Sequence, residues 1–170
     1  TSLIMPMSKF TGIEGASNPL LPAEQEYEME NQIFTPINFY LAQQITDEIY
    51  VGLSVNNPYG LGTKWDDTWV GRYLAVDTEL RTFFFNAVIA YKLSENVSLA
   101  GGFVYALGDV KIIRNVFQAD PVTGQIKPDA QTTLEGDGSS IGWTAGFFYQ
   151  SSDKKSSIGI SVKSEVEFDF

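Results

Sequence analysis

The side chains that usually perform covalent chemistry are either missing from this chain or poorly placed for it. Its 170 residues include no His and no Cys, which excludes a Ser-His-Asp triad, a cysteine nucleophile and imidazole or thiolate metal ligands. Asp66 and Asp67 are adjacent, so their carboxylates point to opposite sides of an extended chain and form no acid–base pair. The stretch Glu135-Gly136-Asp137-Gly138-Ser139 lacks the spacing of an EF-hand loop. We therefore expect no enzyme, no metal site and no cofactor.

The charge balance argues against nucleic acid as a partner. Lys and Arg number 11 against 21 Asp and Glu, a net charge of −10, whereas nucleic-acid binding needs a basic surface. Several glutamates occupy one stretch without a Lys or Arg between them: Glu14, Glu24, Glu26, Glu28 and Glu30. We favour a solvated acidic loop here over a loop that bridges divalent cations to lipopolysaccharide.

The elements that must position any site are strands. The longest nearly apolar run, residues 83–91, is too short for a membrane-spanning helix, which needs about 20 residues. Apolar and small or polar residues instead alternate with a period of two, which only a strand sorts onto two faces. In the C-terminal stretch the predicted apolar, lipid-facing set is Ile158, Ile160, Val162, Val166, Phe168 and Phe170. Seven strands are predicted, near residues 1–10, 32–43, 48–57, 79–93, 97–116, 140–150 and 156–170.

The connections between these strands favour a membrane barrel. Long connections, over residues 11–31, 58–78 and 117–139, alternate with short ones, as in antiparallel barrels that have short periplasmic turns and long extracellular loops. A soluble β-sandwich has no reason to place every long loop at one end. The predicted fold is therefore all-β, an antiparallel transmembrane β-barrel. An odd number of strands leaves two alternatives, a part of a larger barrel or an eight-stranded barrel with one strand uncounted.

Several short motifs, in order, resemble one family. They read Asn57-Pro58-Tyr59-Gly60-Leu61-Gly62-Thr63, Trp69-Val70-Gly71-Arg72-Tyr73, Thr78-Glu79-Leu80-Arg81-Thr82, Ala90-Tyr91-Lys92-Leu93 and Gly142-Trp143-Thr144-Ala145-Gly146. This series resembles the FadL/TodX family of outer-membrane transporters for long-chain fatty acids and hydrocarbons. The resemblance implies a 14-stranded barrel, of which this chain supplies about seven strands. It also implies a hatch before Thr1, further strands after Phe170, and a place in the bacterial outer membrane.

The sharpest candidate site is a gate at Asn57, Pro58, Tyr59, Gly60 and Leu61. Pro58 has no N–H and cannot complete a central ladder, and Gly60 permits backbone angles and close approaches that other residues do not. Together they predict a bend or break in the strand. The resemblance implies that such a kink opens the barrel wall sideways. An ordinary strand-to-loop transition is the alternative.

Two further sets are candidate ligand contacts. Phe84, Val88, Val104 and Phe148 fall on the face that is otherwise small or polar, where they would line an apolar conduit or, equally, pack against the hatch. Phe117, Ile126 and Leu134 are apolar positions in the predicted 117–139 loop, which in the resembling family helps to capture substrate at the surface. Packing of the loop onto its neighbours is the stronger interpretation of that third set.

These features together predict uptake of hydrophobic compounds across an outer membrane, without covalent chemistry. The expected partners are a hydrophobic small molecule, outer-membrane lipid and lipopolysaccharide. The alternative is a barrel of the same fold that transports nothing and serves as a scaffold in protein secretion or assembly, with a protein partner at its extracellular loops.

Overall fold

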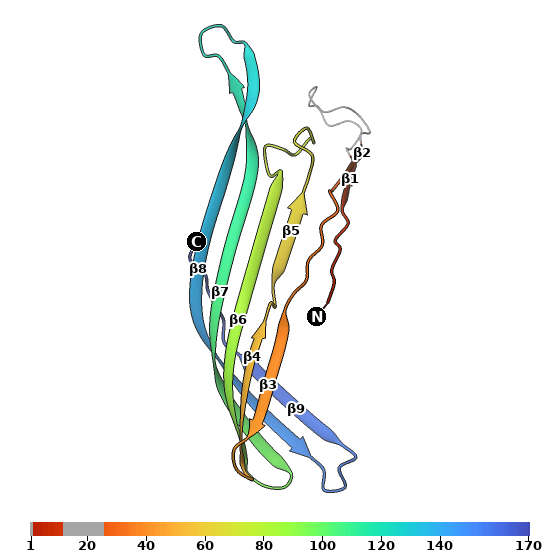
Figure 1. Ribbon diagram of the computed structural model, residues 1–170, viewed down its shortest axis with the longest axis vertical. Coiled ribbons are helices and arrows are strands. Elements are labelled where there is room, and N and C mark those ends of the chain that lie inside the picture. Colours follow the sequence, from red (N-terminus) through yellow and green to blue (C-terminus); the bar gives the residue numbers. More distant parts are fainter. Residues whose placement is uncertain (1, 12–25) are drawn as a thin grey trace.

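The computed structural model describes residues 2–11 and 26–170. Thr1 of the first predicted strand, and Glu14 and Glu24 of the predicted acidic loop, lie outside the described residues. Most of the chain forms one long, curved, antiparallel sheet (Figure 1). Its strands are β3 (Asn38–Gln44), β4 (Ile49–Asn56), β5 (Gly60–Lys64), β6 (Asp77–Lys92), β7 (Val97–Ala119), β8 (Ile126–Gln150) and β9 (Ser157–Lys163), in the order β3-β4-β6-β7-β8-β9, with β5 also paired to β6.

The first predicted strand is not part of this sheet. A three-residue strand, β1 (Lys9–Thr11), pairs instead with β2 (Glu26–Glu28) in a separate two-stranded sheet. Nearer the N-terminus, Ile4 forms an isolated antiparallel bridge with Phe34. Pro6 lies between these pairings and has no N–H to donate, which explains why they do not merge into one strand.

The predicted loop over residues 117–139 is wrong, because β7 and β8 run through most of it. Their ladder extends to Ala119 opposite Ile126, with one irregularity between Val116 and Gln118. A Lys111–Glu135 ion pair (2.8 Å) joins the two strands. At the tip, Asp120 accepts the N–H groups of Val122 and Thr123. Over residues 126–139 of β8 the only large apolar side chains are Ile126 and Leu134, which are too far apart to show an apolar alternation. The strand β5 likewise lies within the predicted 58–78 loop.

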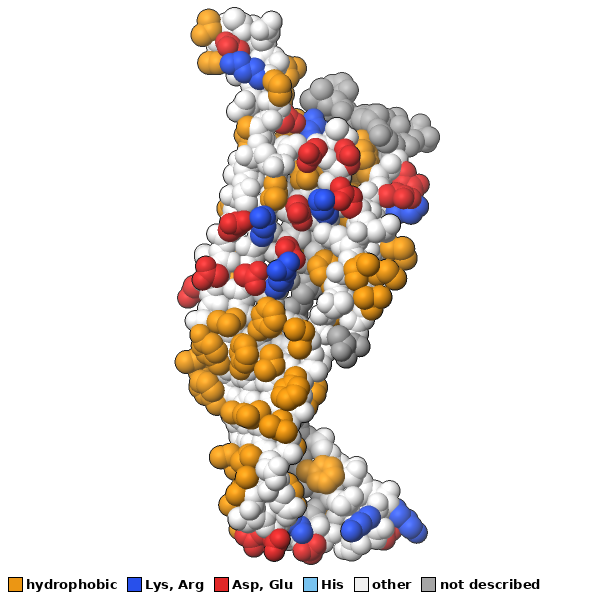
Figure 2. All heavy atoms as spheres, in the orientation of Figure 1, with side chains coloured by type: hydrophobic (Ala, Val, Ile, Leu, Met, Phe, Trp, Pro, Cys, Tyr) orange, Lys and Arg blue, Asp and Glu red, His pale blue; other side chains and the backbone are white. Residues whose placement is uncertain are grey.

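One face of the sheet carries a continuous apolar surface, here called the apolar belt. Figure 2 shows these side chains gathered over the middle of the sheet, with charged side chains above them and at the opposite end. The belt is highly exposed, as a lipid-facing surface is: Trp143 retains 54% of its accessible surface and Ile89 retains 61%. Its members alternate along four strands: Phe85, Ile89, Tyr91, Leu99, Phe103, Tyr105, Leu107, Ile141, Trp143, Phe147, Tyr149, Ile158, Ile160 and Val162.

The opposite face, here the inner face, holds the small core, Phe84, Val104 and Ala106. The C-terminal segment covers it. The predicted strand over residues 156–170 ends at Lys163, and the Ser164 N–H then donates to the Trp143 carbonyl (2.9 Å). Val166 and Phe168 pack against the core. The prediction that these two side chains face lipid is therefore wrong. The same holds for Phe170, whose Cβ lies 3.1 Å from the position of a Cβ on Gly136 at the inner face.

Glycines make room for that segment. A Cβ built on Gly142 would lie 2.7 Å from the Ser164 hydroxyl oxygen, and one on Gly108 would lie 3.1 Å from the Phe168 ring. Side chains at these two positions would therefore hold the segment away from the sheet. In the described residues no helix is long and apolar enough to cross a membrane.

Candidate functional site

The sheet is interrupted at the predicted position, between β4 and β5. Asn56 is the last β4 residue and lies opposite Phe84, while Gly60, the first of β5, lies opposite Arg81. Three residues thus span the distance that two cover on β6, so side-chain alternation inverts across the break. Asn56 falls on the inner face and Gly60 on the outer. Pro58, with no N–H, lies within the interruption, as the sequence predicts.

Side chains replace the missing ladder bonds at this break. Thr82 is 3% exposed, and its hydroxyl donates to the Tyr59 carbonyl (2.6 Å) while accepting the Tyr59 N–H (3.2 Å). The Asn57 amide donates to the Thr82 carbonyl (2.6 Å), and its oxygen accepts the Ile37 N–H (2.8 Å). These bonds satisfy backbone groups that a continuous strand would have paired, and so they fix the shape of the break.

The glycine that needs its lack of a side chain is Gly62, not Gly60. A Cβ at Gly60 would meet only the Leu80 carbonyl, at an ordinary 3.7 Å, and its φ is not positive. At Gly62 a Cβ would overlap the tip of the Phe34 ring. The close approach that the sequence assigned to Gly60 therefore occurs two residues later, on β5 itself.

Beside β5 the wall is not hydrogen-bonded. The β3–β4 ladder ends at Asn38 opposite Asn56, and the next backbone bond across this line is from the Glu30 N–H to the Lys64 carbonyl (2.8 Å). Between them no backbone–backbone bond joins residues 31–37 to residues 57–63, all of which lie in the described range 26–170. We call this unpaired boundary the seam. The Lys64–Glu30 ion pair (2.7 Å) closes its upper end.

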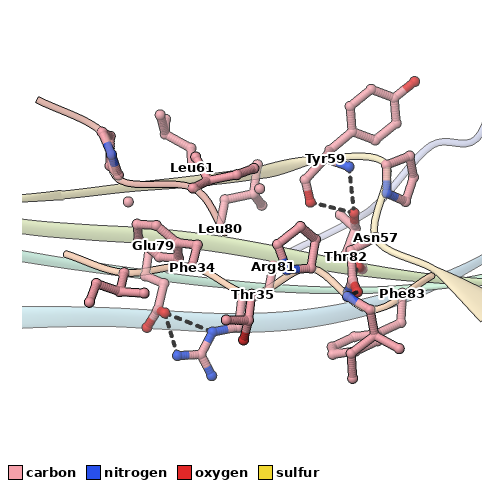
Figure 3. Close-up of a pocket in the computed structure, with 18 residues that line it drawn as sticks. Phe34, Thr35, Asn57, Tyr59, Leu61, Glu79, Leu80, Arg81, Thr82 and Phe83 are labelled. Carbon is pink, nitrogen blue, oxygen red and sulfur yellow. Dashed lines mark hydrogen bonds and ion pairs between the residues drawn. The ribbon is translucent and has the colours of Figure 1, made fainter. Parts of the chain in front are cut away.

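A groove of about 520 Å³ lies along the seam. That volume suits a small apolar ligand. Figure 3 shows the Phe34, Arg81 and Glu79 side chains on one side of the strands and those of Tyr59 and Leu61 on the other, so the groove reaches both faces. Its lining is largely apolar or backbone: Ile4, Pro6, Ile33, Phe34, Thr35, Pro36, Ile37, Asn57, Pro58, Tyr59, Gly60, Leu61, Gly62, Glu79, Leu80, Arg81, Thr82 and Phe83.

The predicted inner-face ligand contacts are only partly together. Phe84 (8% exposed) and Val104 (3%) share the core, and Tyr59 of the break packs edge-on to Phe84, with ring centroids 6.0 Å apart. Val88 lines a second cavity of about 360 Å³ below the break. Phe148 lies apart, opposite Ser98 near the short-turn end, and is 44% exposed.

The predicted surface-loop contacts do not converge. Phe117 lies on β7, where its ring meets Tyr73 edge-on with centroids 6.5 Å apart. Ile126 begins β8 opposite Ala119, and Leu134 lies farther along β8 opposite Ile112. Each of the three is more than half exposed. The hairpin is tied instead to the 65–76 loop, through the Arg72 guanidinium and the Asp129 carboxylate (2.9 Å).

The structure adds residues that the sequence did not single out. Phe34, Gly62 and Thr82 shape the seam, yet Gly62 and Thr82 appeared only as parts of motifs, and Phe34 only as part of a strand. Their contacts join segments that are far apart in the chain, which a periodicity pattern does not report. Across residues 2–11 and 26–170 no group of three or more acidic side chains is placed to hold a metal ion.

Comparison with known proteins gives consistent matches. The family model described as outer membrane protein transport protein (OMPP1/FadL/TodX) matches residues 8–170. A long-chain fatty acid transport protein of Salmonella typhi is 34% identical over 146 residues, which cover 78% of this chain and 33% of that protein. Outer membrane protein P1 of Haemophilus influenzae is 26% identical over 160 residues, 81% of this chain and 34% of that protein.

A solved structure supports the fold. The crystal structure of a Pseudomonas aeruginosa FadL homologue superposes with a TM-score of 0.68 at 24% identity, covering 83% of this chain and 33% of that one. The open sheet described above is therefore a section of an antiparallel β-barrel. The chain spans about a third of the length of the relatives it matches.

Proposed function

Because this chain belongs to the OMPP1/FadL/TodX family of bacterial outer membrane transport proteins, we propose that it forms the part of a barrel wall through which hydrophobic compounds leave sideways into the membrane. The class of substrate we propose is long-chain fatty acids, which the names of several relatives give for those proteins, or hydrocarbons. No bond of the substrate is made or broken. The protein's part is to bind an apolar molecule and to provide a route that avoids water.

The seam is the observation that supports this proposal most. A barrel wall in lipid normally pairs every backbone group, because an unpaired one costs several kcal/mol in hydrocarbon. A stretch without ladder bonds is therefore unusual in such a wall, and here the side chains of Asn57 and Thr82 pair some of the backbone groups beside it.

The level of the seam also suits lateral release. It begins at Asn57, two residues beyond Val55, and Val55 pairs with Phe85 of the apolar belt. A molecule that passes through the seam thus arrives at the rim of the lipid-facing surface. Transfer of its alkyl chain from water into an apolar environment is worth about 0.8 kcal/mol per methylene, so a route from the apolar groove directly into lipid avoids the cost of returning that chain to water.

Stapling the seam tests the route. In the full-length protein, cysteines at Thr35 and Leu61 would be bridged by a short bis-methanethiosulfonate, which forms one disulfide with each thiolate, releases two methanesulfinate ions and is removed by reduction. The measurements are saturable binding of a C16 fatty acid and its rate of transfer from the protein into lipid vesicles. We expect binding within about twofold of the unstapled protein, transfer slowed about tenfold or more, and recovery on reduction.

A matched staple controls for the chemistry. Gln43 and Val51 are ladder partners on β3 and β4, so bridging cysteines there crosses no seam and should leave transfer unchanged. Transfer at the normal rate through a stapled seam would reject the lateral route. Absence of saturable binding, together with a stoichiometric protein partner on purification, would instead favour the scaffold alternative and its contact through the extracellular loops.

A further inference from the structure

We propose that the Phe34 side chain is the shutter of the seam and that Gly62 is its seat, an inference that rests on the proposed lateral route. The ring closes the gap in the resting protein and must swing off Gly62 before an apolar molecule can pass. Phe34 is thus a gating residue whose size sets the rate of release.

At the level of Gly62 the closest contact across the seam is made by the Phe34 ring. The Phe34 ring occupies the space where any side chain at position 62 would begin, with its Cε1 atom 2.9 Å from the position of that Cβ. Gly62 is buried although its neighbours Leu61 and Lys64 are exposed. A ring on one strand and a bare backbone on the other therefore fill the place where ladder bonds are missing.

The backbone of Phe34 is held elsewhere, so the ring can move alone. Its N–H donates to the Ile4 carbonyl and its carbonyl accepts the Ile4 N–H, both at 2.9 Å. These bonds anchor the main chain on the side away from β5. Opening then needs a change of side-chain rotamer rather than the separation of two strands, and rotamer changes are among the fastest motions in proteins.

The closed position is only weakly held. The Gln32 amide oxygen would lie 3.2 Å from a Cβ at Gly62, so it borders the same seat. It is buried and has no hydrogen-bond partner among the described residues. A buried oxygen without a hydrogen bond costs free energy, so conformations in which it meets a donor or water are favoured. The unpaired Gln32 oxygen therefore destabilises the closed position, and the packing of the Phe34 ring on Gly62 must offset this cost.

Two substitutions should move the release rate in opposite directions. Phe34→Ala removes the shutter, and we expect transfer of a bound C16 fatty acid into vesicles to become about tenfold faster. Gln32→Met keeps the length of the side chain but removes the unpaired oxygen, and we expect transfer to slow about threefold. Equilibrium binding is measured in parallel because Phe34 also lines the groove, and in both variants the transfer rate should change by more than the dissociation constant does.

A swap and a control sharpen the test. In the double variant Phe34→Gly with Gly62→Phe, a ring again spans the seam from the other strand, and the transfer rate should return to within about twofold of the unmodified protein. Phe39→Ala is the control, since Phe39 is an exposed β3 residue paired to Val55 below the seam, and its transfer rate should not change.

The outcomes separate the shutter from the route. If the Thr35–Leu61 staple blocks transfer but Phe34→Ala transfers at the unmodified rate, the seam is the exit and Phe34 is not its shutter. If the staple has no effect, the route itself is rejected, and the shutter with it. A faster Phe34→Ala, a slower Gln32→Met and recovery in the swap would together support the shutter.

Discussion

The two hairpin boundaries that flank the centre of the sheet are built in opposite ways. Between β7 and β8 the ladder runs from Val97 opposite Tyr149 to Ala119 opposite Ile126, with one irregularity. Between residues 31–37 and 57–63, which the structure also describes, backbone pairing is missing. The first boundary is held by the main chain and the second by side chains. A wall can thus be rigid in one place and able to open in another without a change of fold.

The largest effect should come from crowding β7, which is fully paired to β6 as well as to β8. A Cβ at Gly102 on β7 would lie 2.6 Å from the Ala87 carbonyl oxygen and 2.7 Å from Val88. Because backbone there cannot yield, Gly102→Val should lower the free energy of unfolding by about 3 kcal/mol. Urea unfolding of the full-length protein in lipid measures it.

The adjacent residue supplies the control for that experiment. Nothing lies within 4 Å of a Cβ at Gly101, so Gly101→Val should be nearly neutral. Equal losses in both variants would mean that strand propensity, rather than packing across the ladder, governs this boundary.

A smaller effect is expected where side chains hold the break. Thr82→Val removes the hydroxyl that serves both the N–H and the carbonyl of Tyr59. The part-buried backbone groups of Tyr59 lose this partner, so stability should fall by about 1 kcal/mol, and Thr82→Ser should retain most of it. If Thr82→Val unfolds at the same urea concentration as the unmodified protein, water or another group satisfies the break, and our account of it fails.

The smallest effect concerns the tip of the β7–β8 hairpin, outside the apolar belt. The N–H groups of Thr123 and Val122, with Lys127, lower the pKa of Asp120 from 3.8 to about 2. A lowered carboxyl pKa means that its contribution to turn stability is complete above pH 3.8 and is lost as pH falls through about 2. The Thr123 amide resonance should therefore titrate with a midpoint near pH 2. A midpoint near 3.8 would show that the turn does not hold the carboxylate.

Much of the sheet could be predicted because the residues of the apolar belt alternate with small or polar residues every second position. Phe83 to Tyr91 and Val97 to Leu107 alternate strongly, since one face meets lipid. The break could be predicted from Pro58 because a proline lacks an N–H whatever its surroundings, so no knowledge of tertiary contacts is needed. The first part of β8, before residue 140, was missed because Ile126 and Leu134 are its only large apolar side chains, so little in the sequence marks its period.

Other features depended on contacts that no local pattern reports. Val166 and Phe168 alternate as a strand would, and only their contacts with the core and with Gly142 and Gly108 show that they turn inward. Phe34 on Gly62 joins residues 28 positions apart in the chain. The candidate gate was thus located from the sequence, whereas the side chain that occupies it was not.

The inverted side-chain alternation between β4 and β5 can be recognised in the sequences of other barrels. Inner-face positions are even-numbered on β4 (Gly52, Ser54, Asn56) and odd-numbered on β5 (Leu61, Thr63). The alternating pattern of this strand therefore changes phase at Pro58. Deleting one residue between Asn56 and Gly60 would restore the phase and turn Gly62 inward, away from Phe34. A phase slip inside a barrel strand is visible without any structure, so it offers a search criterion for wall openings in barrels of unrelated sequence.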